Sequence, residues 1–170
     1  MRMGLGRGMG KGCKCPYNKN KPATFSIAAG YANTGTKRIN FSEPVTVTIT
    51  GGVTLSIGST QYQSGDTIPV ATGVYHTLTI NNPGEDAGTI TFGKRKQITY
   101  LSLNNLGSSV ITGDITGMKL TYLYLNSLGS SVIRGKITGM KLTYLYLNGI
   151  GSSVITGDIT GMKLTYLYLN

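Results

Sequence analysis

The chain has 170 residues and a formal net charge of +10, although only 13% of its residues are charged. This length is enough for one or two domains with a hydrophobic core, and the many Gly, Thr, Ser and Tyr residues favour strands joined by tight turns. The chain has no run of 18 apolar residues, so it is predicted to have no membrane span. The predicted fold class is all-β.

Residues 1–21 form a predicted extended basic segment with six basic side chains and no acidic one. Glycine alternates with other residues from position 4 to position 12, and this period of two gives an extended segment one bare face. Such a segment can add to a partner's sheet edge, so we expect an anchor peptide; the alternative is a flexible basic tail. The predicted docking residues are Met3, Leu5, Arg7, Met9, Lys11, Cys13 and Cys15.

The two cysteines, Cys13 and Cys15, are too few for a zinc site, which needs about four ligands. Free thiols or a site shared between chains remain open. The sequence indicates no cofactor, no metal and no catalytic residue, so we expect a protein that is not an enzyme.

Residues 22–96 are predicted to form a small β-sandwich of about five to seven strands. The clearest predicted hairpin joins 45–50 to 53–57 through Gly51-Gly52, because apolar residues alternate with Thr or Ser on both arms. Further strands are predicted at 24–29, 38–42, 74–81 and 88–93. We expect this domain to cap the region that follows, with the basic run 94–96 solvated at the seam.

Residues 97–170 contain a 22-residue unit at 98–119, 120–141 and 142–163, which begins again at 164–170. A fixed period of this size is typical of a solenoid, in which each unit stacks on its neighbour. We expect one strand per unit, and further units beyond Asn170. Leu123, Leu125, Leu145 and Leu147 are predicted to point inward, together with Val132, Ile137 and Met140.

Alternation in the strands predicts two outward columns of tyrosine, which together use seven of the eleven tyrosines. The first column is Tyr100, Tyr122, Tyr144 and Tyr166; the second is Ser102 followed by Tyr124, Tyr146 and Tyr168. Tyrosine suits contact with sugars or proteins, but the columns could equally stabilise a shaft or pack on a second copy. Asp114, Lys136 and Asp158 are predicted to share one slot with alternating charge.

The pattern L-x-x-L-x-L, as in Leu120, Leu123 and Leu125, resembles the leucine-rich repeat family over residues 98–170. That resemblance implies a short parallel strand per repeat and an irregular return. The Asn of the family pattern is displaced here to Asn104, Asn126, Asn148 and Asn170, which puts the asparagine ladder and the curvature in question. A solenoid similar to a parallel β-helix is the near alternative.

The TYLYLN and SSVITGDITGM units also resemble repeat proteins of bacteriophages that infect gut Bacteroides-type bacteria, and surface proteins of those hosts. The resemblance implies a virion structural protein, a head or tail fibre, docked to capsid or tail proteins through residues 1–21. Its repeats would reach a host surface glycan or protein, and the fibre would be a homo-oligomer, with a trimer as one candidate. The alternative is a secreted or cell-surface adhesin. Nucleic-acid binding is disfavoured, because most of the positive charge lies in the tail.

Overall fold

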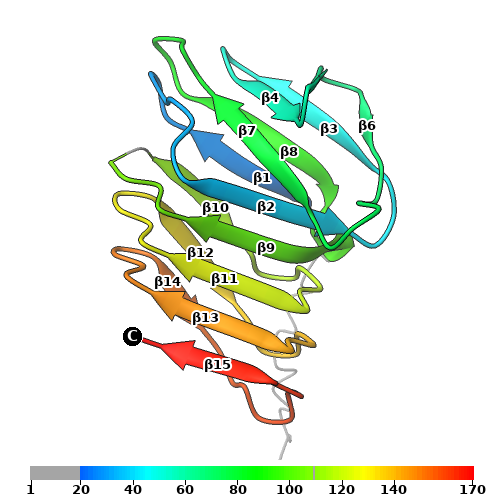
Figure 1. The fold of residues 1–170 in the computed structure, drawn as a ribbon, viewed down its shortest axis with the longest axis vertical. Coiled ribbons are helices and arrows are strands. Elements are labelled where there is room, and N and C mark those ends of the chain that lie inside the picture. The colour runs from blue at the N-terminus through cyan, green and yellow to red at the C-terminus, as the bar shows by residue number, and fades with distance from the viewer. Residues whose placement is uncertain (1–19, 109) are drawn as a thin grey trace, which may run out of the picture.

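The computed structural model describes residues 20–108 and 110–170, and strands and turns make up nearly all of this part of the chain (Figure 1). The strands form two sheets, which we name sheet I and sheet II. Their orders are β14-β12-β10-β1-β8-β3-β6 in sheet I and β15-β13-β11-β9-β2-β7-β4-β5 in sheet II. No helix in the described residues is long and apolar enough to cross a membrane. The all-β prediction is confirmed.

Eight strands between residues 22 and 94 form an antiparallel sandwich. Sheet I contains β1 (Pro22–Ile27), β3 (Val45–Thr50), β6 (Thr67–Ile68) and β8 (Gly88–Lys94). Sheet II contains β2 (Thr36–Phe41), β4 (Thr54–Ile57), β5 (Thr60–Tyr62) and β7 (His76–Asn81). Alternating side chains of each strand point into the core, as the exposed and buried positions of β1 show.

The predicted hairpin of 45–50 and 53–57 is wrong. β3 pairs with β8 and β6 in sheet I, whereas β4 pairs with β7 and β5 in sheet II. Gly51 and Gly52 carry the chain from one sheet to the other, and a Cβ at Gly51 would lie 2.9 Å from the Cα of Gly88. The glycines therefore permit a close backbone crossing between layers.

The repeats form a β-solenoid of about three turns, and each complete unit supplies two strands. The first strands are β9 (Ile98–Asn104), β11 (Tyr122–Asn126), β13 (Tyr144–Asn148) and β15 (Tyr166–Leu169). The second strands are β10 (Ile111–Asp114), β12 (Val132–Lys136) and β14 (Val154–Thr156). The expectation of one strand per unit with an irregular return is wrong, and the two parallel layers correspond to the β-helix-like alternative.

The two sheets of the solenoid differ in register. In sheet II, residues 22 apart are paired, for example Leu123 with Leu145. In sheet I, residues 20 apart are paired, for example Gly113 with Ile133. Equivalent residues of successive units are therefore displaced by two positions along the second strands, a shift that keeps every side chain on its original face.

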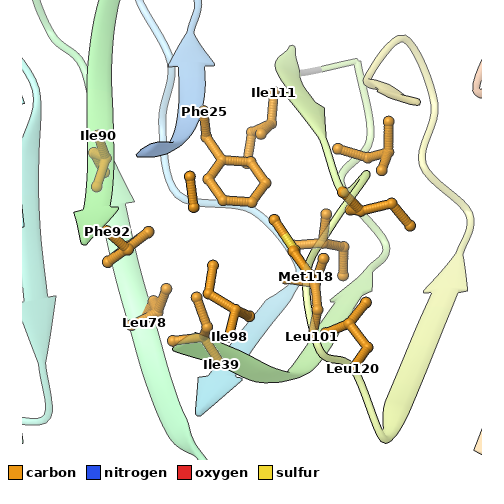
Figure 2. Packing of buried hydrophobic residues seen from close by; sticks show 14 of the residues in the cluster. Phe25, Ile39, Leu78, Ile90, Phe92, Ile98, Leu101, Ile111, Met118 and Leu120 are labelled. Atoms are coloured by element: carbon orange, nitrogen blue, oxygen red, sulfur yellow. The ribbon is translucent and has the colours of Figure 1, made fainter. Parts of the chain in front are cut away.

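The sandwich and the solenoid share both sheets and one core. β1 pairs antiparallel with β10, and β2 pairs antiparallel with β9, so the parallel strands continue the sheets of the sandwich. Buried side chains from both regions form one cluster, in which Phe25, Ile39 and Phe92 of the sandwich lie near Leu101 and Ile111 (Figure 2). The sandwich thus covers the first turn of the solenoid and leaves no break in the apolar core there.

The predicted inward residues are confirmed with one exception. Leu123, Leu125, Leu145, Leu147, Ile137 and Met140 are all buried. Val132 is only half-buried, and its neighbour Ile133 is fully buried instead. Val132 and Ile133 are adjacent in β12 and point to opposite faces of the strand, so the burial of Ile133 places Val132 on the outer face.

A buried serine in each described turn explains part of the repeated G-S-S-V sequence. The Oγ of Ser131 accepts a hydrogen bond from the backbone N–H of Ile111 at 2.9 Å, and Ser153 accepts one from Ile133 at the same distance. Ser131 and Ser153 are buried. Each hydroxyl therefore satisfies a backbone donor of the preceding turn that would otherwise be buried without a partner.

A short 3₁₀ helix, η1 (Arg95–Gln97), joins β8 to β9 at the seam between the two regions. Arg95 donates hydrogen bonds to the carbonyl oxygens of Pro22, at 3.0 Å, and Thr116, at 3.2 Å. The prediction that the basic run 94–96 is solvated is therefore wrong for Arg95, whose guanidinium connects the start of β1 to the first solenoid turn.

Candidate functional site

The two predicted tyrosine columns exist and together form what we call the tyrosine face. They lie on the outer side of sheet II, carried by β9, β11, β13 and β15. In β11 and β13 the tyrosines of the Y-L-Y-L-N sequence are half-buried, whereas the leucines between them are buried. The parallel register pairs Tyr122 with Tyr144 and Tyr124 with Tyr146, so the rings repeat at the strand spacing.

The rings of each column stack on one another. In the first column the centroids of successive rings are 4.2, 4.3 and 4.5 Å apart, with interplanar angles of 6°, 10° and 7°. In the second column the separations are 4.5 and 4.7 Å. Because each ring covers the face of the next, the columns present ring edges and hydroxyl groups outward, and interior rings have no free face for a flat ligand.

The first column continues into the sandwich through two residues that sequence reasoning missed. The ring of Tyr75 lies 5.2 Å from that of Tyr100, and the guanidinium of Arg38 lies 4.6 Å from the centre of the Tyr75 ring. Tyr100 and Ser102 are consequently buried at this end, at 7% and 3% exposure. The cation–π contact closes the aromatic stack against the sandwich.

Packing within the columns raises the pKa of four of the tyrosines. Burial, together with the neighbouring tyrosines, raises the pKa of both Tyr122 and Tyr144 to about 12. Burial also raises the pKa of Tyr100 and of Tyr124. A phenolate at Tyr100, Tyr122, Tyr124 or Tyr144 would lose solvation, so the raised pKa keeps these four hydroxyl groups protonated well above physiological pH.

An asparagine ladder runs beside the tyrosine face despite the displaced position of the asparagines. The Nδ2 of Asn126 donates to the Oδ1 of Asn104 at 2.8 Å, Asn148 donates to Asn126 at 2.9 Å, and Asn170 donates to Asn148 at 3.2 Å. Each rung is thereby fastened to the next along one edge of sheet II.

The predicted charge slot is wrong. Asp114 lies opposite Arg134, and Lys136 lies opposite Thr156, because residues 20 apart are paired in sheet I. Asp158 is therefore displaced from Lys136 by the same two positions. The carboxylate of Asp114 forms its ion pair with Arg95, at 2.7 Å.

The surroundings of the two aspartates lower their pKa values. Burial alone would raise the pKa of Asp114, but hydrogen bonds from Thr116 and the Arg95 guanidinium outweigh it and lower that pKa. Hydrogen bonds from Thr160 lower the pKa of Asp158. Both carboxylates are therefore ionised at neutral pH and engaged in local structure, which does not match the raised pKa of a general acid.

The predicted docking residues of the tail, including Cys13 and Cys15, lie outside the residues that the structure describes. Within residues 20–108 and 110–170, no group of three or more His, Cys, Asp or Glu side chains is placed to hold a metal ion.

A buried lysine in the sandwich was also missed by sequence reasoning. Lys37 is 1% exposed, its Nζ donates to the carbonyl oxygen of Thr34 at 2.6 Å, and it lies 5.5 Å from the centre of the Tyr31 ring. Burial lowers its pKa to about 8. Its place in β2, at an inward position of a T-K-R-I-N-F strand, was the available signal, since Ile39 and Phe41 share that face.

Comparison of the sequence with protein-family models, with curated proteins and with solved structures gives no match.

Proposed function

We propose that this protein is a non-enzymatic structural component of a bacteriophage particle, a head or tail fibre. In this proposal residues 1–21 dock to capsid or tail proteins, the sandwich forms the base, and the solenoid projects outward. The observation that carries the proposal is the continuous stack, in which both sheets and the core extend from the sandwich through every turn. Such a stack is stiff and can gain or lose units without changes elsewhere.

The assignment to a phage is supported by the resemblance of the TYLYLN and SSVITGDITGM units to repeats of such particles and of their hosts. We relate the repeats to leucine-rich repeats through the L-x-x-L-x-L pattern of the first strand. The second strand of each turn departs from what that resemblance implies.

The tyrosine face is the proposed contact with a host surface glycan. Its exposed hydroxyl groups and ring edges offer hydrogen-bond donors and acceptors at the strand spacing, about 4.8 Å. Contact would occur through these edges, because the ring faces are occupied by neighbouring rings. The same face would serve the alternative function, a secreted or cell-surface adhesin, without any particle.

Incorporation into particles tests the proposal. Particles from infected cultures that supply either the full chain or a variant lacking residues 1–21 are purified and probed by immunoblot. We expect the deletion to lower incorporation at least tenfold while the purified variant keeps its β-rich circular dichroism spectrum. A matched variant keeps the length and the glycines of the tail but carries Ser at Leu5, Arg7, Met9 and Lys11, and it should fail in the same way.

Normal incorporation of both variants would contradict the anchor. Recovery of the full chain from the bacterial surface in the absence of particles would favour the adhesin.

A further inference from the structure

One corner of the solenoid carries a row of lysines. Lys119, Lys141 and Lys163 occupy the same position in the three units, and all three are exposed. The turn after each lysine is joined to the same turn of the preceding unit by a threonine side chain. The hydroxyl of Thr121 donates to the carbonyl oxygen of Thr99 at 3.2 Å, and the hydroxyl of Thr143 donates to the carbonyl oxygen of Thr121 at 3.1 Å. The lysines therefore repeat along the corner at about the strand spacing, 4.8 Å.

Like charges at this spacing repel one another. Asp114 forms an ion pair with Arg95, and within the described residues no ion pair involves Lys119, Lys136, Lys141 or Lys163. A row of cations that the fold does not neutralise is complementary to a ligand with a row of anions.

The middle unit adds one further positive charge at this corner. It has Lys136 where its neighbours have Asp114 and Asp158. The aspartates of the first and third units accept the backbone N–H of a threonine two residues later, at 2.8 and 2.7 Å. Lysine has no acceptor, so the middle unit gives up this turn hydrogen bond and gains a cation.

Lys119 and Lys136 border a cleft between the first and second turns. The cleft has a volume of about 390 Å³ and is lined by Lys119 and Lys136 together with Thr116, Thr138 and the adjoining Gly-Met pairs. The backbone N–H of Lys136 donates to the Oγ1 of Thr116 at 3.1 Å, which holds the two turns side by side. Two cations from different turns and two hydroxyl groups thus surround one open space.

We propose that this corner binds a linear acidic polysaccharide with a carboxylate or sulfate on each sugar, seated over Lys119, Lys136, Lys141 and Lys163. The threonine hydroxyls of the cleft would contact sugar hydroxyls. A nucleic acid fits less well, because unpaired bases bind by stacking on exposed ring faces, whereas the tyrosine rings cover one another and lie on sheet II. The site is separate from the tyrosine face and does not depend on the fibre proposal.

Binding of polygalacturonate to the full-length protein tests this site. The basic tail would also attract a polyanion, so all measurements use a background in which Arg2, Arg7, Lys11, Lys14 and Lys19 are changed to Gln. In that background Lys136→Asp restores the residue of the neighbouring units. The control, Thr60→Asp with Gln61→Asp, makes the same change in net charge at exposed positions of β5.

We expect the background protein to bind polygalacturonate at 50 mM salt but not dextran, which is neutral, and to weaken as salt rises. Lys136→Asp should weaken binding about fivefold or more and lower the slope of log K against log salt by about one, while the control stays within twofold. Absence of binding, or equal weakening by both variants, would overturn the site. Tighter binding of oligo(dT) than of polygalacturonate, with the same sensitivity to Lys136→Asp, would overturn the choice of polysaccharide.

Discussion

At the scale of single residues, Lys37 has an environment that is unusual for its type, because it is a buried lysine in the core of the sandwich. A lysine that is 1% exposed has lost most of its hydration, and the carbonyl of Thr34 and the ring of Tyr31 replace only part of it. Its charged form is therefore disfavoured in the folded protein, which is the physical cause of its lowered pKa.

This burial predicts that stability rises with pH. The pKa of Lys37 is about 8 in the folded protein and 10.5 as its ordinary value, so between these values the unfolded chain binds more protons. The cost of charging Lys37 is full below pH 8 and is relieved as pH rises toward 10.5, by about 3 kcal/mol in total. Urea unfolding between pH 7 and pH 9.5 should show the rise, and Lys37→Met should abolish it.

Lys119→Met is the matched control for that measurement, because Lys119 is exposed. The control should keep the pH dependence of the wild type. A Lys37→Met protein with an unchanged pH profile would show that the ammonium is solvated in the folded state.

At the scale of the structural element, the turns are held by repeated side-chain hydrogen bonds. Asparagine fastens the end of each first strand, threonine fastens its start, and buried serine fastens the second strand to the preceding turn. These contacts recur from unit to unit. Asparagine side chains bond to one another, threonine hydroxyls add a second hydrogen bond to carbonyls that already accept a backbone N–H, and serine hydroxyls supply an acceptor for a buried backbone N–H.

The adjacent serines of the middle unit allow a matched test of the serine contact. Ser131 is buried and accepts from the backbone of Ile111, whereas Ser130 is exposed. Ser131→Ala should lower the free energy of unfolding by about 1–3 kcal/mol, because it leaves a buried N–H without a partner. Ser130→Ala should change it by less than about 0.5 kcal/mol. Equal effects in urea unfolding would contradict the role of Ser131.

At the scale of the whole molecule, the tyrosine face connects four strands of the solenoid to the sandwich. The first column runs from Tyr166 through Tyr144 and Tyr122 to Tyr100, then to Tyr75 and Arg38. Contact between successive rings stabilises the packing of each turn on the next, and the exposed ring edges are available to a ligand. The two roles can be separated, since stacking needs the ring whereas hydrogen bonding needs the hydroxyl group.

Triple variants at Tyr122, Tyr144 and Tyr166 separate these roles. Changing all three to Ser should lower the free energy of unfolding by about 2–4 kcal/mol, because three stacked contacts of roughly 0.5–1.5 kcal/mol each are lost. Changing all three to Phe should keep stability within about 1 kcal/mol and should weaken binding to host surface glycans on an array. Glycan binding that the Phe variant retains in full would leave the tyrosine face as a packing surface.

Much of this architecture could be predicted from the sequence because it is local. The 22-residue period predicts stacked turns, and the alternation of Tyr with Leu predicts the outward columns and the buried leucines. Both patterns depend on neighbours a few residues apart or on exact repetition. Tyr75 and Arg38 could not be assigned to the first column, since they come from outside the repeats and meet it only in the folded chain.

The tertiary structure decided how the strands are partnered. The alternating pattern of 45–57 is compatible with a hairpin or with two strands in different sheets. The chain places the two strands in different sheets, where apolar side chains of both are buried between the sheets. A shift of two residues leaves inward and outward positions unchanged, so the pattern cannot distinguish a register of 20 from one of 22 in sheet I. The sequence by itself therefore determined which faces are apolar and which carry tyrosine, whereas packing between the two sheets determined which residues lie opposite one another.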